Sequence, residues 1–301
     1  MKISRVAIIG LGLIGGSVGL SVREMLPDVA TTGWDADADV RARAAELGLA
    51  GMVCDSVAEA VREADLVILC VPVGAMGYAA EAIAPHIRPG TIVSDVGSSK
   101  RSVGEALAAA LPEAVVIPAH PVAGTENSGP EAGFATLFRH RWCIVTPRDD
   151  TPPDALAALT GFWEGLGATV EIMDPRHHDL VLAVTSHIPH LIAYTIVGTA
   201  SDLEEVTRGE VIKYSAGGFR DFTRIAASNP TMWRDVFLSN RDAVLEVLRR
   251  FTEDLSLLQR AIRNGDGDTL YDLFDRTRTI RRSIIEQGQD DARPDFGRKD
   301  H

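Results

Sequence analysis

The sequence is poor in lysine, cysteine and aromatic residues, and basic side chains are outnumbered by acidic ones. Among 301 residues there are 30 basic and 42 acidic side chains, a formal net charge of -12. Phosphate backbones and anionic lipid surfaces attract basic proteins, so this charge argues against a nucleic-acid or membrane partner. The three cysteines, Cys54, Cys70 and Cys143, lie in apolar runs. We interpret them as free thiols of a reducing, cytoplasmic compartment.

No stretch has the pattern of a targeting signal or of a membrane span. Met1 leads directly into an apolar strand pattern without a basic leader, which also favours a cytoplasmic location. The most apolar later stretch, residues 180–197, is interrupted by His187, Pro189 and His190. We therefore expect it to form a buried helix and not a membrane span.

Short apolar runs alternate with helical patterns through the first 173 residues, which is typical of stacked strand-helix-strand units. The run at residues 66–71 is apolar without interruption, as expected for a parallel strand covered on both faces. The other strand-like runs are residues 6–9, 29–34, 91–94, 115–118 and 143–145. The sequence thus predicts an α/β fold whose N-terminal part is a Rossmann-type, doubly wound, mostly parallel sheet.

Beyond residue 173 the pattern is helical throughout. Asp174-Pro175 and Asn229-Pro230 each pair a capping residue with a proline suited to the first helical turn, and Asn264-Gly265 is a helix stop. We expect His177-His178-Asp179 to be solvated in a first turn and predict no metal site. The predicted domains are residues 1–173 for the Rossmann domain, 174–286 for an all-helical domain and 287–301 for a polar tail.

A glycine-rich turn follows the first predicted strand. Gly10, Gly12 and Gly15 match the G-x-G-x-x-G fingerprint, and Asp35 ends the next strand, where a carboxylate can bind ribose hydroxyls. Asp35 disfavours the extra phosphate of NADP, so NAD is the predicted cofactor. An ordinary strand-helix turn, with Asp35 as a helix cap, is the alternative. The other predicted cofactor contacts are Leu13, Ile14, Val71, Pro72 and Ser98.

Polar residues follow the later strands, where ligands of parallel sheets bind. His120 stands between two prolines, which suits a rigid loop presenting a ring nitrogen to a substrate. Ser186 and His190 share a helix face next to Pro189, which should kink that helix. Arg224 or Arg220 could clamp a carboxylate. His120 could instead be a loop histidine bonded to the backbone, His190 a satisfied core histidine, and either arginine a member of a surface ion pair.

Several motifs together resemble one enzyme family. They are Asp95-x-Gly-Ser98, His120-Pro-x-Ala-Gly-Thr-Glu126-x-Ser-Gly129, Ser186-His-x-Pro-His190 and Gly218-Phe-x-Asp-Phe-Thr-Arg224-Ile-Ala. With the glycine-rich turn, these motifs make the chain similar to the prephenate/arogenate dehydrogenases of tyrosine biosynthesis over most of residues 3–285. The resemblance implies oxidative decarboxylation of prephenate or arogenate, with hydride transfer to NAD.

The resemblance also implies roles for individual residues. His120 would accept the hydroxyl proton, and Ser98 would orient His120 and the nicotinamide. Arg224 would bind the ring carboxylate, and His190 and Ser186 would position the substrate. Weaker candidates for the pocket wall are Thr125, Glu126 and Trp233.

The family's helical domain forms a dimer, and the long apolar helices favour a homodimer here. A beta-hydroxyacid dehydrogenase is one rival interpretation, but its pattern has a lysine on the long second-domain helix, which this chain lacks. A catalytically silent NAD-binding sensor is another rival interpretation. Turnover of prephenate would exclude the sensor. Whether prephenate, arogenate or both are accepted stays open.

Overall fold

The computed structural model describes residues 2–125, 127–207 and 217–286. The predicted polar tail, residues 287–301, and the predicted site residue Glu126 lie outside these ranges. The chain divides into two compact units, Met1–Leu245 and Glu246–His301. Every side chain discussed below as part of the site belongs to the first unit. The predicted boundary at residue 173 stays a prediction.

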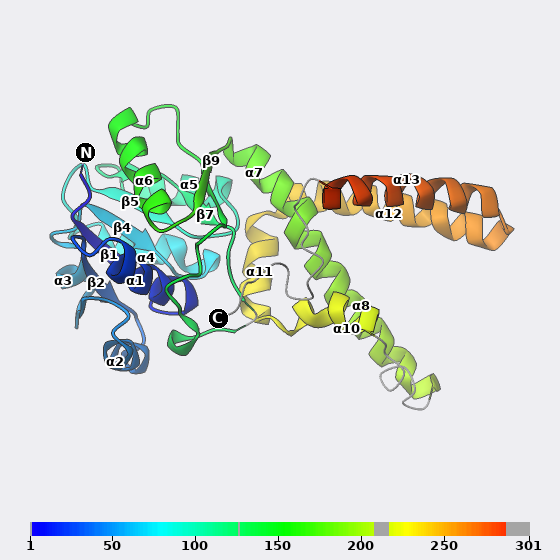
Figure 1. The fold of residues 1–301 in the computed structure, drawn as a ribbon, viewed down its shortest axis with the longest axis horizontal. Coiled ribbons are helices and arrows are strands. Elements are labelled where there is room, and N and C mark those ends of the chain that lie inside the picture. The colour runs from blue at the N-terminus through cyan, green and yellow to red at the C-terminus, as the bar shows by residue number, and fades with distance from the viewer. Residues whose placement is uncertain (1, 126, 208–216, 287–301) are drawn as a thin grey trace. The chain divides into compact units, whose positions relative to one another are not determined.

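A six-stranded parallel sheet forms the N-terminal part of the chain (Figure 1), with the strand order β3-β2-β1-β4-β5-β6. The order reverses direction between β1 and β4, the position at which doubly wound sheets bind ligands beyond the carboxyl ends of their strands. The strands are β1 Arg5–Ile9, β2 Ala30–Trp34, β3 Met52–Val53, β4 Leu66–Leu69, β5 Ile92–Asp95 and β6 Val115–Val116. The predicted Rossmann-type sheet is confirmed.

Helices cover both faces of this sheet because its strands are apolar on both sides. In β1, Val6 and Ile8 join the apolar cluster formed with helices α1 and α6, whereas Ala7 and Ile9 join the cluster formed with α3, α4 and α5. Successive strand side chains point to opposite faces, so a continuous apolar run supplies both cores. The helices are α1 Leu13–Met25, α2 Ala38–Leu47, α3 Val57–Val61, α4 Met76–Ile83, α5 Arg101–Ala110 and α6 Pro153–Gly165.

A second, three-stranded sheet was not predicted. It consists of β7 Ala119–Pro121, β8 Trp142–Val145 and β9 Thr169–Ile172, with β7 antiparallel and β9 parallel to β8. Residues 143–145, expected in the main sheet, lie here. His120, expected in a loop, lies in β7. An apolar run looks the same in either sheet, so only the backbone pairing decides between them.

The described residues after residue 173 are mostly helical, as predicted. Asp174 caps α7 Pro175–Leu182 by accepting hydrogen bonds from two backbone N–H groups, and Asn229 caps α11 Pro230–Ser239 in the same way. A π-helical turn, η3 Ala183–His187, precedes α8 Ile188–Thr207. This turn lies just before Pro189, where a kink was expected, because proline cannot donate the normal helical hydrogen bond. Next come α10 Gly217–Thr223 and η4 Arg224–Ala227.

The stretch Pro175–Leu203 is long and apolar enough to cross a membrane by length and composition alone. It carries buried His178, Asp179 and His187, which are costly groups in hydrocarbon. The expectation of a buried helix holds only in part. Val184, Ile196 and Val197 are exposed.

The second unit is described by helices α12 Arg241–Asn264, which begins in the first unit, and α13 Gly267–Glu286. Gly265 separates the two helices with a φ of +67°, a conformation that glycine adopts without strain, and this confirms the predicted stop. Apolar side chains on α13, among them Phe274 and Ile280, are exposed.

Candidate functional site

The glycine-rich turn leaves open space where a pyrophosphate would bind. A Cβ on Gly10, whose φ is +98°, would lie 2.6 Å from the Cys70 carbonyl oxygen, and a Cβ on Gly15 would collide with the Gly10 carbonyl oxygen. Both positions therefore require glycine. Gly12, by contrast, has nothing within 4 Å of its Cβ position and stands at the N-terminus of α1, where N–H groups favour an anion. These residues fit a dinucleotide.

Asp35 lies beside this turn, at the end of β2. Its carboxylate accepts hydrogen bonds from the Leu11 N–H at 2.8 Å and from the Asp37 N–H at 3.0 Å, which leaves a lone pair on each oxygen for ribose hydroxyls. Arg41 donates to the carbonyl oxygens of Asp35 and Ala36 at 2.8 and 3.2 Å. Arg41 is therefore a basic residue close to Asp35.

His120 is buried in β7 and is held by residues that were expected in solvent. Its Nδ1 lies 2.9 Å from Nε2 of His178, and Nδ1 of His178 lies 2.9 Å from a carboxylate oxygen of Asp179. His178 is 0% exposed and Asp179 5%, so the prediction that they are solvated was wrong. They follow the capping residue Asp174 in the first turn of α7, but that turn packs inward against α5.

A buried ion pair supports the strand that carries His120. The Lys100 ammonium lies 2.5 Å from Asp95 and donates to the Ala119 carbonyl oxygen at 2.6 Å, and Lys100 and Asp95 are both 0% exposed. Asp95 also accepts hydrogen bonds from the Gly97 and Ala119 N–H groups. The pair thus ties the carboxyl end of β5 to the residue before His120. No sequence signal singled out this lysine as buried.

His187 extends the polar cluster toward α11. Asn240 donates to the Asp179 carbonyl oxygen at 2.8 Å and lies 3.1 Å from Nδ1 of His187 through the same amide nitrogen. Within the described residues Nε2 of His187 has no hydrogen-bond partner, although the Ser98 backbone lies near enough to raise its pKa. Ser98 is half-buried, and its predicted role in orienting His120 stays a prediction.

His190 and Trp233 form the other wall of the candidate site. Their rings are stacked with centroids 3.6 Å apart, and Nδ1 of His190 is bonded to the Ser186 carbonyl oxygen at 2.8 Å. The Arg224 charge acts on His190, and η4, which contains Arg224, packs on α8. Tyr194 bonds the Ser228 carbonyl oxygen at 2.6 Å and ties these elements together. The structure therefore gathers four predicted substrate-binding residues.

Burial keeps the histidines of the site neutral. The pKa of His120 is lowered well below its ordinary value, first by burial and then by the positive charges of His178, Lys100 and His187. Burial also lowers the pKa of His178, against the opposing effect of Asp179, and lowers the pKa of His187 to about 4. A neutral imidazole can accept a proton, so His120 is available as a base at neutral pH.

The remaining predicted site residues include two at the cofactor turn and one after β7. The Val71 side chain is 3.1 Å from the Cβ position of Gly10, which places it at the cofactor turn, and Pro72 follows it. Thr125 is half-buried and accepts a hydrogen bond from the Asn127 N–H at 3.2 Å. Among the described residues no group of three or more histidine, cysteine or acidic side chains could hold a metal ion.

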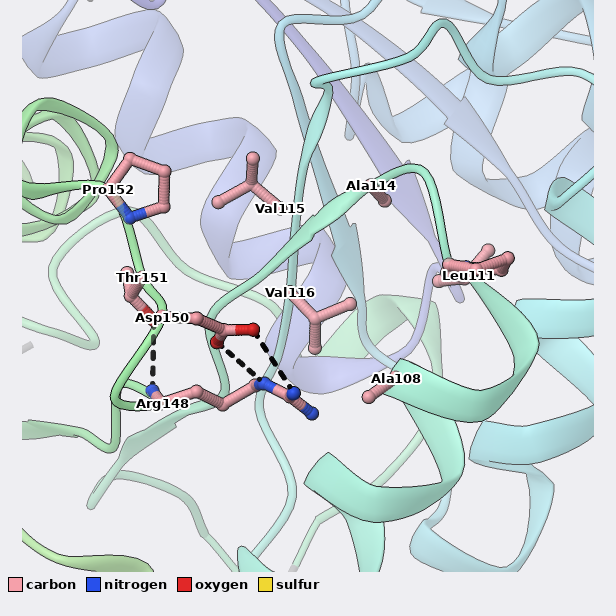
Figure 2. A pocket seen from close by; sticks show the side chains of 10 residues that line it. Ala108, Leu111, Ala114, Val115, Val116, Arg148, Asp150, Thr151 and Pro152 are labelled. Atoms are coloured by element: carbon pink, nitrogen blue, oxygen red, sulfur yellow. Dashed lines mark hydrogen bonds and ion pairs between the residues drawn. The ribbon is translucent and has the colours of Figure 1, made fainter.

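A cavity of about 220 Å³ elsewhere on the first unit contains none of the predicted site residues. The Arg148 guanidinium there is paired with Asp150, with Nε and a carboxylate oxygen 3.0 Å apart, and Figure 2 shows the two side chains facing each other. Its remaining walls are mostly alanine, valine, leucine and proline side chains. The polar residues of this cavity, Arg148, Asp150 and Thr151, bond to one another, so the candidate active site remains the polar cluster around His120.

Comparison with known proteins matches both parts of the chain to family models. Residues 18–172 match the prephenate dehydrogenase nucleotide-binding domain, and residues 174–276 match the prephenate dehydrogenase dimerization domain. A cyclohexadienyl dehydrogenase of Zymomonas mobilis is 47% identical over 279 residues, which is 93% of this chain and 95% of that protein.

Two solved structures share the whole fold. A prephenate dehydrogenase from Aquifex aeolicus, in complex with hydroxyphenyl propionate and NAD+, has a TM-score of 0.87 and 31% identity, and the match covers 94% of this chain and 99% of that one. A Synechocystis arogenate dehydrogenase has a TM-score of 0.79 and 26% identity, covering 93% and 99%. With its dinucleotide turn and its histidine cluster, the chain belongs to the prephenate dehydrogenase family and is an NAD-dependent oxidoreductase.

Proposed function

We propose that this protein oxidatively decarboxylates prephenate, arogenate or both in tyrosine biosynthesis, and that His120 is its base. The observation that carries the proposal is the position of His120, a buried neutral histidine in the strand tied to β5, beyond the carboxyl end of the sheet that holds the dinucleotide turn. NAD bound at that turn supplies the hydride acceptor. The identity of its relatives supports the substrate class.

His120 removes the proton from the ring hydroxyl as hydride leaves the same carbon. That carbon becomes a carbonyl, which draws the electrons of the ring carboxylate bond through the conjugated ring as carbon dioxide leaves. The ring becomes aromatic, and the phenolate oxygen takes the proton back from His120. No covalent intermediate with the protein is needed. Because His120 is neutral in its buried setting, it starts the step in the form that accepts a proton.

Arg224 binds the ring carboxylate, and the His190–Trp233 stack forms the wall against which the substrate ring is placed. An anionic substrate entering a chain of net charge -12 needs a local cation, and Arg224 is exposed beside His190. A guanidinium can bind a carboxylate through two parallel hydrogen bonds. Ser186 contributes through its carbonyl oxygen, which fixes the His190 ring. Ser98 and Thr125 complete the proposed site.

Turnover tests the proposal directly. The purified protein is mixed with NAD and either prephenate or arogenate, and formation of reduced cofactor is followed by its absorbance. The aromatic product is identified by mass spectrometry. Turnover of one or both compounds is expected, and their ratio sets the side-chain preference. Binding of NAD without turnover of either compound would instead favour the NAD-binding sensor.

We further propose a cytoplasmic homodimer formed through the helical region. The family model for residues 174–276 is named a dimerization domain, and apolar side chains of α8 such as Ile196 and Val197 are exposed. Exposed apolar faces of this kind are usually covered by a partner. Light scattering after size exclusion should give twice the chain mass of 32.3 kDa. Ile196→Asp should shift the population toward monomer.

A further inference from the structure

His120 stands at one end of a hydrogen-bond chain that runs through two other side chains to the backbone of α5. His120 contacts His178, which contacts Asp179, both at 2.9 Å. Asp179 then accepts hydrogen bonds from the backbone N–H groups of Lys100 at 2.7 Å and Arg101 at 3.1 Å. Lys100 and Arg101 form the N-terminus of α5, where the helix dipole favours a negative charge.

The protons of this chain can be placed from its anchored end. A carboxylate that already accepts two backbone N–H groups can only accept, so Nδ1 of His178 carries the proton it donates to Asp179. A neutral imidazole with its proton on Nδ1 has a lone pair on Nε2. That lone pair faces Nδ1 of His120, which must then carry its own proton. The Nε2 atom of His120 is left unprotonated.

We propose that His178 and Asp179 are positioning residues that hold His120 in the tautomer with its lone pair on Nε2, which makes Nε2 the base of the reaction. That the proton comes from the substrate hydroxyl rests on the proposed function. The substrate hydroxyl proton moves to Nε2 of His120, while the proton on Nδ1 stays in its hydrogen bond to His178. One proton is gained by His120 and one is lost by the substrate, so the step is balanced.

The charged groups around His120 explain why a carboxylate behind His178 would assist the reaction. The charged or titratable groups that face it are Lys100, paired with Asp95 of β5, and the imidazoles of His178 and His187. All three cationic forms oppose the imidazolium that forms during the reaction. Asp179, placed behind His178, is the carboxylate that polarises the chain in the opposite sense, as a carboxylate does behind a catalytic histidine.

Two variants of His178 separate the positioning role from simple packing. His178→Gln keeps an oxygen that can accept from Nδ1 of His120, whereas His178→Phe fills the space without an acceptor. In prephenate turnover we expect His178→Phe to lower kcat by about 100-fold or more, by analogy with loss of the orienting group in other histidine bases. KM for prephenate should change by less than about threefold, since no contact to the substrate is removed.

The glutamine variant should recover kcat to within about tenfold of the parent protein, because the acceptor is restored. His177→Phe is the matched control, because His177 is the preceding residue of the same helix and is exposed. It should leave kcat and KM unchanged. A folded glutamine variant as inactive as His178→Phe would overturn the proposal.

Nitrogen-15 spectra of histidine-labelled protein test the tautomer without any turnover. The His120 signals are assigned by their loss in His120→Asn, and above its pKa the ring should show a protonated Nδ1 and a bare Nε2. A His120 ring protonated on Nε2 would sink the proposal even if the phenylalanine variant fails to fold. If the parent protein shows the expected tautomer but turns over neither compound, the proposed function fails and the positioning chain stands.

Discussion

Replacing Lys100 by methionine tests whether the buried ion pair between Lys100 and Asp95 stabilises the folded protein. Methionine keeps the length of the side chain but removes the ammonium, which is paired with Asp95 and bonded to the Ala119 carbonyl oxygen. Both members of the pair are 0% exposed, so water cannot replace the lost charge without entering the core. The variant therefore leaves a buried carboxylate with only the backbone donors of Gly97 and Ala119.

Removing one partner of such a buried pair costs about 3 to 5 kcal/mol of unfolding free energy. In a chain of this size that corresponds to a fall in melting temperature of roughly 6 to 20 °C, at about 2 to 4 °C per kcal/mol. Replacing both members, with Asp95→Asn added to Lys100→Met, should recover part of this loss because no unpaired charge remains buried. The Lys100 charge also lowers the pKa of His120, so the acid limb of activity should move to higher pH.

Calorimetric melts of the single and double variants at one protein concentration measure these differences, since the transition of an oligomer depends on concentration. Arg249→Met is the matched control, because the Arg249–Glu253 pair, 2.9 Å apart, is exposed on α12. The control substitution should change the melting temperature only slightly. A Lys100→Met transition within about 2 °C of the parent's, or a double variant less stable than the single one, would refute the reasoning.

Three further variants and one titration follow from the proposed site. His120→Asn should lower kcat by roughly 100-fold or more while substrate and NAD still bind, and the acid limb of the pH profile should vanish. Because burial lowers the pKa of His120, that limb in the parent protein should lie on the acid side of about pH 6.5. Arg224→Ala should raise KM for prephenate by an order of magnitude or more with NAD affinity unchanged, and an unaltered KM would move the anchor to Arg220. Asp35→Ser should narrow the preference for NAD over NADP in steady-state kinetics, aided by the neighbouring base Arg41, and equal use of both cofactors by the parent would contradict the role of Asp35. The free energy of unfolding should fall as pH drops below about 6.5, because the buried histidines of the site have lowered pKa values and the unfolded chain binds protons more readily; a flat denaturant titration between pH 7 and 5 would contradict their burial as neutral groups.

The sequence by itself determined the features that depend on local chain chemistry. The turn at Gly10 needs a positive φ, and Asp174 and Asn229 cap helices through bonds to residues two and three positions away. Such contacts are encoded within a few residues, so motif and spacing predict them. The continuous apolar strands likewise predicted a sheet covered on both faces, and with it the NAD-binding fold.

Only the tertiary structure decided what surrounds His120. The sequence reading placed His178 and Asp179 in solvent, because a polar first turn of a helix is usually exposed, and it assigned residues 143–145 to the wrong sheet. The buried charge of Asp179 is stabilised by backbone N–H groups 79 and 78 residues away in the sequence. The buried charge of Lys100 is stabilised by the carboxylate of Asp95 and by a carbonyl oxygen on β7. Burial of a charge depends on partners brought together by packing, and no local pattern contains them.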